Sequence, residues 1–274
     1  MDENMEQYEN WANRKFARLV TGGASALADE AIGYALAHPF QLTVSAEEPL
    51  VSSGPVDGLW EWAVFSSCPP GKSLRKTERA LRREVRDARK LDKMKYSDKM
   101  LLETSGLAGE AALWPCAEGS WDFNVTFPKH EYACAGQSYR LVLCSPTKVA
   151  GFCAVTTTAT YSLGDAAPDL DVRIWGVFVS PAYRGRELSN MLAEGAAVVV
   201  LDMVRQLQDR LVALQISQVF DVELQVQGEL DSNDDLRFLF KIKDWLERLI
   251  ETTPLISEGG ESVLRIKDVV VCDV

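Results

Sequence analysis

The sequence predicts an α/β fold of the α+β type, and two patterns in its second half support this. Between residues 139 and 179, three segments rich in β-branched and aromatic residues follow one another, and a Pro-containing turn at 145–148 joins the first two as in a β-hairpin. After residue 187, two segments with apolar residues at helical spacing alternate with two strand-like segments. The expected order of elements in this half is therefore β-β-β-α-β-α-β.

Composition and the flanking turn and cap residues place these elements along the chain. We expect strands at 139–144, 149–161, 172–179, 219–228 and 264–272, and helices at 187–214 and 233–250, the last capped by Ser232 or Asn233. A polar loop containing Gly and Pro separates the second strand from the third.

The first half begins with a predicted helical N-terminal extension, residues 1–58. Apolar residues at three- and four-residue spacing predict a helix over 4–37, interrupted near Gly22–Gly23. The prolines and glycines of 49–58 mark a loop or a domain boundary. Residues 59–274 are then expected to form the main domain.

A strongly basic segment, residues 72–99, follows an expected strand at 59–66. It holds 12 basic and five acidic residues, so its net charge is +7, while the rest of the chain carries −18. Apolar residues such as Leu74 and Leu81 form a seam along it, which predicts a helix. One interpretation is a solvated face over a core-facing stripe; the other is contact with a polyanion, such as RNA, DNA or an acidic partner. Residues 122–127 are a further candidate strand.

Composition argues against several classes of protein. No segment approaches the ~18 consecutive apolar residues of a membrane span, and the first residues are acidic and polar, so we expect a cytoplasmic protein without membrane contact. The six cysteines form no CxxC pair and are interpreted as small buried hydrophobes; with two histidines no metal site is expected. Neither His38 nor His130 has a recognisable nucleophile partner, which argues against a histidine-dependent hydrolase.

The chemically most informative segment is 174–192, IWGVFVSPAYRGRELSNML. A strand that enters a tight glycine-containing turn and then a helix directs several backbone N–H groups at one point. The helix dipole adds partial positive charge there, and Arg184 and Arg186 add full charges. Such a cradle suits a pyrophosphate. The alternative is an ordinary strand-turn-helix connection with surface arginines.

Together with the order of elements, this segment resembles the GNAT superfamily of acetyl-CoA-dependent N-acetyltransferases, over about residues 138–274. The family's loop pattern [Q/R]-x-x-G-x-[G/A] falls on Arg184, Gly185, Arg186, Glu187, Leu188 and Ser189. A second family pattern, N-x-x-A-x-x-[L/F]-Y, falls on Asn233, Leu236, Leu239 and Phe240. The resemblance implies a GNAT-like, mixed, mostly antiparallel twisted sheet flanked by helices, with acetyl-CoA as cosubstrate.

The resemblance also implies which residues contact the coenzyme. They are Val177, Phe178, Val179, Arg184, Gly185, Arg186, Glu187, Leu188, Ser189 and Asn233. In the family, backbone N–H groups at the positions of Val177, Phe178 or Val179 stabilise the oxyanion of acyl transfer.

Acyl transfer to an amine also needs the amine to lose a proton, and two carboxylates are candidate bases. Asp171 lies two residues before Arg173, on the same face of the expected strand, and Glu223 lies on the neighbouring strand. The alternative interpretation, which the pattern favours for each, is an ordinary strand-end or surface carboxylate. Proximity alone also accelerates acyl transfer, so an absent base does not exclude catalysis.

Three residues depart from the family pattern. Glu187 replaces the central glycine of the loop and places a carboxylate near the expected phosphates. Phe240 stands where many members have a tyrosine that protonates the leaving thiolate, and phenylalanine has no proton to donate. Arg173 stands where many members have a catalytic glutamate.

The leading hypothesis is therefore a GNAT-like N-acyltransferase that moves an acetyl group from acetyl-CoA to a primary amine of a small-molecule or protein acceptor. The alternative is a catalytically degenerate GNAT-fold binding or regulatory protein, acting through a protein or nucleic-acid partner. In a third hypothesis the acceptor is an RNA or a nucleotide-linked amine held by the basic helix at 72–99. The pattern identifies neither the acceptor nor the oligomeric state.

Overall fold

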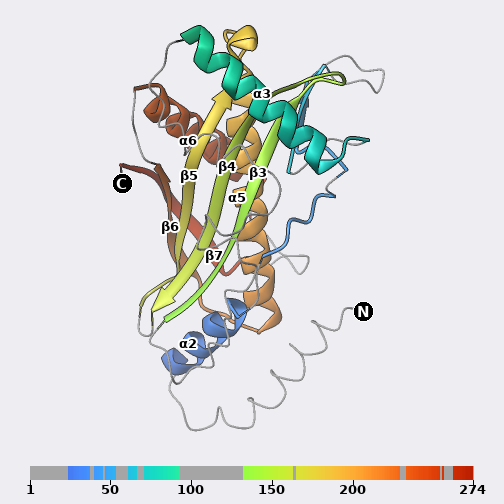
Figure 1. The fold of residues 1–274 in the computed structure, drawn as a ribbon. Coiled ribbons are helices and arrows are strands. Elements are labelled where there is room, and N and C mark those ends of the chain that lie inside the picture. The colour runs from blue at the N-terminus through green and yellow to red at the C-terminus, as the bar shows by residue number, and fades with distance from the viewer. Residues whose placement is uncertain are drawn as a thin grey trace.

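The computed structural model places seven strands in one mixed, curled sheet with the order β1-β2-β3-β4-β5-β6-β7 (Figure 1). It describes residues 24–37, 40–45, 47–53, 61–66, 71–92, 132–162, 165–228, 233–253, 255 and 262–273. The strands are β1 (Val51–Ser53), β2 (Trp62–Phe65), β3 (Tyr132–Cys144), β4 (Val149–Ser162), β5 (Asp169–Val179), β6 (Phe220–Gly228) and β7 (Leu264–Asp273). Neighbours from β1 to β5 are antiparallel, whereas β5–β6 and β6–β7 are parallel.

Four α-helices are described, together with one short 3₁₀ helix. They are α2 (Ala24–Ala35), α3 (Leu74–Asp92), η2 (Pro181–Tyr183), α5 (Leu188–Ala213) and α6 (Asn233–Thr252). The predicted α/β class and the predicted order β-β-β-α-β-α-β of the second half are confirmed.

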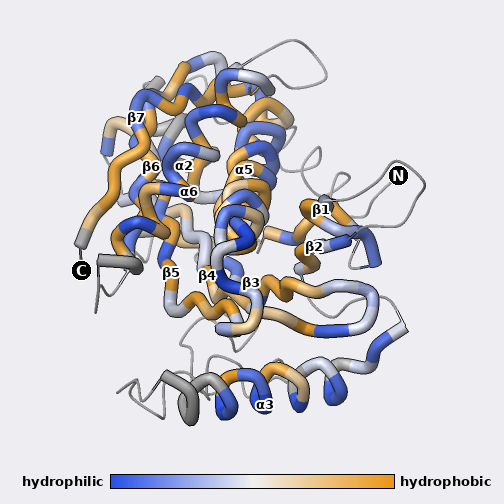
Figure 2. Tube along the Cα trace, turned by 90° about the horizontal axis from the view of Figure 1, so that it is seen from above, coloured by the Kyte–Doolittle hydropathy of each residue, from blue (hydrophilic) through white to orange (hydrophobic). Residues whose placement is uncertain are grey.

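The helices lie on opposite faces of the sheet. Seen from above, α2, α5 and α6 lie on one side and α3 lies alone on the other (Figure 2). The crossovers β5-α5-β6 and β6-α6-β7 both advance in the same direction along the sheet, so right-handed connections place α5 and α6 on the same face. The α5 side holds the larger part of the core.

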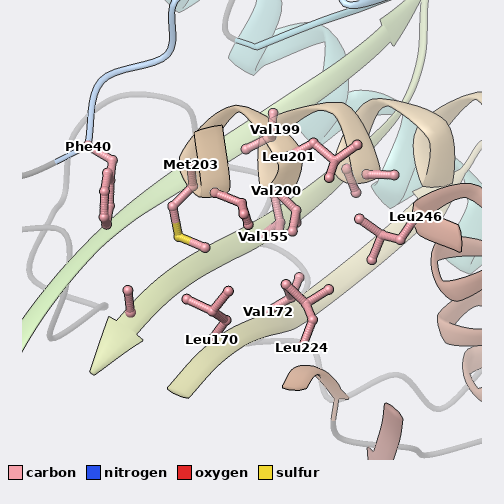
Figure 3. Close-up of a cluster of buried hydrophobic side chains, with 14 of the residues drawn as sticks. Phe40, Val155, Leu170, Val172, Val199, Val200, Leu201, Met203, Leu224 and Leu246 are labelled. Atoms are coloured by element: carbon pink, nitrogen blue, oxygen red, sulfur yellow. The ribbon is translucent and has the colours of Figure 1, made fainter. Parts of the chain in front are cut away.

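The main core is formed where α5 packs on the middle of the sheet (Figure 3). Val155, Leu170, Val172 and Leu224 point from β4, β5 and β6 toward the helix, because alternate residues of a strand share one face. Gly195 lets α5 approach the sheet closely, since a Cβ there would lie 2.9 Å from Val64.

A second, smaller core lies between α3 and the opposite face of the sheet. Leu81 and Val85 of α3 are buried there against Phe65, Phe152 and Phe178. The two phenylalanines of β4 and β5 stack with their ring centroids 6.0 Å apart. This cluster fixes which side of α3 faces the sheet.

The described part of the predicted extension joins the same core. Ala31, Ile32 and Ala35 of α2 are buried in the main cluster, and the Arg210 guanidinium of α5 donates to the Ala35 carbonyl over 2.9 Å. The phenol of Tyr161 on β4 bonds to the Asp29 carboxylate of α2. Residues 4–23 of the predicted helix lie outside the described residues.

Strand boundaries differ from the predicted ones where pairing is not local. β1 occupies residues expected to be a loop, and it forms through its register with β2. β3 begins at Tyr132 rather than 139, because its small and polar first residues pair along β4 as far as Ser162. β5 likewise begins at Asp169 rather than 172. The candidate strand 122–127 lies outside the described residues.

The cysteines that the structure describes behave mostly as predicted. Cys134, Cys144 and Cys153 are buried and Cys272 is half-buried, and none of the four is in a disulfide in the described part of the chain. Burial raises the pKa of Cys144 to about 12, although Lys72 acts in the opposite direction, so this thiol is not a reactive nucleophile. Among the described residues, no helix is long and apolar enough to cross a membrane.

Candidate functional site

A β-bulge interrupts the pairing of β5 with β4 at Trp175. Ala154 pairs with Gly176 and Val155 pairs with Ile174, so Trp175 is the extra residue on β5. Its indole Nε1–H donates to the Thr156 hydroxyl over 2.8 Å, which holds the bulge in place. A bulge bends and twists its strand, and bulges occur preferentially beside functional sites.

Beyond the bulge, no described strand pairs with the side of β5 that faces away from β4, and we call this stretch its free edge. In the described residues, β6 pairs with β5 only from Leu170 to Ile174 and ends at Gly228, whereas β5 continues to Val179. The first half of β5 therefore pairs with the second half of β6. The second half of β5 leads directly to the loop that precedes α5, above the arrowhead of β5 in Figure 1.

The hydrogen-bond pattern between β4 and β5 shows in which direction the backbone groups on this edge point. The Ser180 N–H donates to the Ala150 carbonyl of β4 over 2.8 Å. Because the groups of an antiparallel strand alternate in direction, those of Phe178 also point to β4, and those of Val177 and Val179 point away from it. The Arg184 side chain accordingly donates its Nε–H to the outward carbonyl of Val179, over 3.3 Å.

The loop between β5 and α5 is a tight turn with two left-handed residues. Gly185 has φ of 77°, and Glu187, which is the N-cap of α5, has φ of 56°. Glu187 makes no side-chain capping bond, and its exposed carboxylate is the one anionic group in the turn 184–187. The first N–H groups of a helix have no partner within it, so those that follow Glu187 are directed toward this turn.

Four side-chain contacts join the loop and the first turn of α5 to three other elements. The Ser180 hydroxyl donates to Glu84 of α3 over 2.7 Å, and Tyr183 packs edge-on against Trp62 of β2 at 5.2 Å between ring centroids. From α6, the Lys241 ammonium donates to the Ser189 hydroxyl over 2.8 Å, and the Trp245 indole donates to Asn190 over 3.1 Å. The turn and the start of α5 are thus held by α3, β2 and α6.

Positive charge gathers at this end of α5. Arg184 and Arg186 are exposed on the turn, and the Arg186 guanidinium lies 5.9 Å from the centroid of the Tyr183 ring. Lys241 adds a third cation. Sequence analysis missed Lys241, because its partner Ser189 is 52 residues away and the only local signal was its place next to Phe240 in the second family pattern.

The two candidate bases do not reach the free edge. Asp171 lies on the face of β5 opposite α5 and accepts a bond from the Gln227 amide over 3.0 Å. Val177 is six residues further along β5, which corresponds to roughly 17–20 Å. Glu223 is exposed on β6 and pairs in register with Asp268 of β7, further still from the edge.

Arg173 shares the strand face of Asp171 and packs against Trp175, the bulge residue. The Arg173 guanidinium stacks over the Trp175 ring, 4.2 Å from its centroid. Thr156, which receives the indole bond, also bonds to the hydroxyl of Ser138 over 2.9 Å. The residue at the family's glutamate position is therefore part of a structural polar cluster.

The pKa of Asp171 is raised from its ordinary value of 3.8, first by burial and then by the nearby charge of Asp169. Since the folded protein binds this proton more tightly than the unfolded chain, stability falls as pH rises through the folded pKa, and the loss is complete above it. Asp171→Asn is therefore expected to increase the free energy of unfolding at pH 7, with a gain that shrinks toward pH 4. Urea unfolding at the two pH values measures this.

Glu223→Gln is the matched control for that substitution, because Glu223 is exposed on the same face of the sheet. It should leave the free energy of unfolding unchanged within about 0.5 kcal/mol. An Asp171→Asn protein that is no more stable than its parent at pH 7 would contradict the expected effect of burial.

The remaining predicted residues lie on α6. The helix begins at Asn233, as expected, but the side chain of Asn233 lies outside the described part of the structure. Phe240 is 47% exposed. No group of three or more potential metal ligands is found among the residues that the structure describes.

Comparison with known proteins adds no assignment: no protein-family model, no curated protein and no solved structure matches this chain.

Proposed function

We propose that this chain binds acetyl-CoA along the free edge of β5 and transfers the acetyl group to a primary amine, as in a GNAT-type N-acetyltransferase. The observation that carries the proposal is the free edge itself. Val177 and Val179 direct backbone groups away from β4, no described residue of β6 pairs with them, and that edge leads straight to a cationic turn at the start of α5.

Each part of the site matches a part of the ligand. The amide groups of an extended pantetheine arm are able to pair with the outward groups of Val177 and Val179, as an added strand pairs with a sheet edge. The pyrophosphate would lie at the turn, where the first N–H groups of α5, Arg186 and Lys241 attract it. An acetyl group at the inner end of the arm would lie near the bulge at Trp175.

The steps of acetyl transfer then follow from the position of the thioester beside the backbone of β5. The amine nitrogen attacks the thioester carbonyl, the carbonyl oxygen becomes an oxyanion that accepts a bond from an outward N–H of β5, and the thiolate leaves. Since Asp171 and Glu223 are too distant to take the amine proton directly, it passes to water. Positioning is then the main source of rate, and activity should rise with pH as more acceptor amine is uncharged.

Isothermal titration with acetyl-CoA and with CoA tests the binding step. We expect a dissociation constant below about 1 mM, which corresponds to about −4 kcal/mol. No heat of binding with millimolar ligand would contradict the proposal. Turnover of acetyl-CoA with a panel of primary amines, followed by thiol release, tests the transfer step.

A second function, coenzyme binding without catalysis, is favoured by one observation: neither candidate base lies within reach of the free edge. Acetyl-CoA would then act as a bound ligand of a regulatory protein. Titration and turnover experiments distinguish the two functions. Binding of acetyl-CoA without release of the CoA thiol for any amine supports the second function. Thiol release above the uncatalysed rate excludes it.

Glu187 provides a specific test of the turn. A left-handed backbone costs a residue with a Cβ about 1 kcal/mol, and the Glu187 carboxylate repels a neighbouring phosphate. Glu187→Gly is expected to raise stability by about 0.5 kcal/mol and to tighten acetyl-CoA binding several-fold. Calorimetric titration and urea unfolding measure the two effects.

The matched control is Glu187→Ala, which removes the charge but keeps the left-handed strain. It should tighten binding to a similar extent without raising stability. If neither variant changes affinity, then Glu187 does not face the ligand and the pyrophosphate is not at this turn.

A further inference from the structure

The exposed face of α3 carries a dense group of positive charges. It carries Arg75, Lys76, Arg79, Arg82, Arg83 and Arg86, all of them exposed, and we call these six residues the α3 basic face. The one exposed carboxylate described among them is Asp87. Such a face on a chain of net charge −11 needs a physical explanation.

The orientation of α3 makes this face a continuous stripe. Thr77, Leu81 and Val85 are buried against the sheet, and with 3.6 residues per turn the six cations fall on the opposite side of the helix. In Figure 2, α3 lies apart from the other helices and is hydrophilic along most of its length. From Arg75 to Arg86 the stripe is about 16 Å long.

We propose that the α3 basic face binds the phosphodiester backbone of a nucleic acid. One strand carries a phosphate about every 3.4 Å along the helix axis, so about five phosphates match the length of the stripe. Five of the six cations are arginines, whose planar guanidinium donates two parallel bonds to phosphate oxygens. The inference stands apart from the proposed function and does not rest on it.

A protein partner fits this face less well. The centre of a protein–protein interface is apolar and depleted of charge. Among the described residues, the large apolar side chains that are exposed are Val219 and Phe240, and neither belongs to α3. Electrostatic attraction alone is the typical basis of sequence-independent nucleic-acid binding.

The rest of the molecule would orient the bound strand. Because the chain outside the basic segment is acidic, it repels phosphates and leaves the outer side of α3 as the favourable approach. Glu84, on the inner side of the same helix, accepts the bond from Ser180 at the start of the candidate loop. A strand along α3 would therefore pass close to the cationic turn of the candidate site.

The test uses the whole chain and fluorescence anisotropy with labelled 20-mers: single-stranded RNA, single-stranded DNA and duplex DNA of one sequence. Binding is measured between 50 and 300 mM NaCl. The parent should bind at least one of them, with affinity that falls steeply with salt. In Arg79→Glu/Arg83→Glu/Arg86→Glu, affinity at 100 mM NaCl should fall at least 30-fold, and the slope of log affinity against log salt should shrink by about 2 to 3.

The matched control is Arg205→Glu/Arg248→Glu/Lys267→Glu, which changes the same number of exposed cations on α5, α6 and β7. Both variants lower the net charge by six, so a general charge effect would weaken binding equally. The neutral variant Arg79→Gln/Arg83→Gln/Arg86→Gln, which introduces no new carboxylates into α3, should lose about half as much in log affinity as the reversed one.

Four outcomes would overturn the proposal. Two of them are that no probe binds at 50 mM NaCl with 100 µM protein, or that the affinity is unchanged in both α3 variants. The third is that the control variant loses as much affinity as the α3 variant with reversed charges. The fourth is that poly-glutamate displaces the probe as effectively as unlabelled nucleic acid of equal charge. The last outcome would assign the face to acidic proteins instead.

Discussion

Gly151→Ala is expected to destabilise the protein by about 3 kcal/mol, which is among the largest effects of a single methyl group on this fold. A Cβ at Gly151 would lie 2.3 Å from the Phe178 carbonyl oxygen and 3.3 Å from the Cα of Val179. Both atoms belong to the backbone of β5, so relief requires β5 to move away from β4. Urea unfolding measures the loss.

Gly136→Ala is the control, because it adds a Cβ to β3, where the nearest contact is 3.1 Å, to the backbone oxygen of Thr157 on the neighbouring strand β4. It should cost clearly less than Gly151→Ala. The displaced residues in Gly151→Ala include Val179 on the free edge, so acetyl-CoA binding should weaken as well. Equal costs for the two substitutions would contradict the close approach of β5 to β4 at Gly151.

Reversing the two cations nearest the start of α5, in Arg186→Glu/Lys241→Glu, is expected to weaken acetyl-CoA binding at least 100-fold. A hydrogen bond to a charged group contributes about 1.5–3 kcal/mol, and two are lost. A 100-fold loss corresponds to about 2.7 kcal/mol, which the two bonds alone supply before any repulsion by the new carboxylates. Isothermal titration at fixed ionic strength measures the change.

Arg205→Glu/Lys267→Glu gives the same change in net charge at exposed positions on α5 and β7, and it should leave binding within threefold of the parent. Unfolding of both variants by urea shows whether the fold is intact. If the Arg186/Lys241 variant is folded and binds acetyl-CoA as the parent does, the pyrophosphate does not lie at this turn.

The elements of the second half were predictable because their signals are local. The hairpin turn at 145–148, the apolar spacing of α5 and the start of α6 at Asn233 are each readable within a few residues. β1 and the first half of β3 were not, because their residues have weak strand propensity and become strands only through partners far along the chain.

In the candidate site too, the features with local sequence signals were predictable, and those that depend on distant residues were not. The turn at Gly185 and its two arginines, Arg184 and Arg186, follow from the sequence, as does the shared strand face of Asp171 and Arg173. The contacts of Ser180 with Glu84 and of Ser189 with Lys241 join residues 96 and 52 positions apart, and no local pattern indicates them. The free edge depends on where β6 ends relative to β5, which only the register reveals.

That edge also changes the significance of the candidate bases. Alternation correctly places Asp171 and Arg173 on one face of β5, yet six residues of extended strand separate Asp171 from Val177 by roughly 17–20 Å. The resemblance to the GNAT family nevertheless predicts both positions as parts of one site. In the structure, the backbone groups expected to bind the coenzyme lie far from the carboxylates expected to remove the amine proton.

The central claim is that acetyl-CoA lies along the free edge of β5, and a crystal structure of the chain with CoA tests it most directly. We predict the pantetheine amides in hydrogen bonds with the backbone of Val177 and Val179, and the pyrophosphate at the turn of Gly185 beside Arg186 and Lys241. A coenzyme bound elsewhere, with the edge at Val177 and Val179 unchanged, would contradict the account.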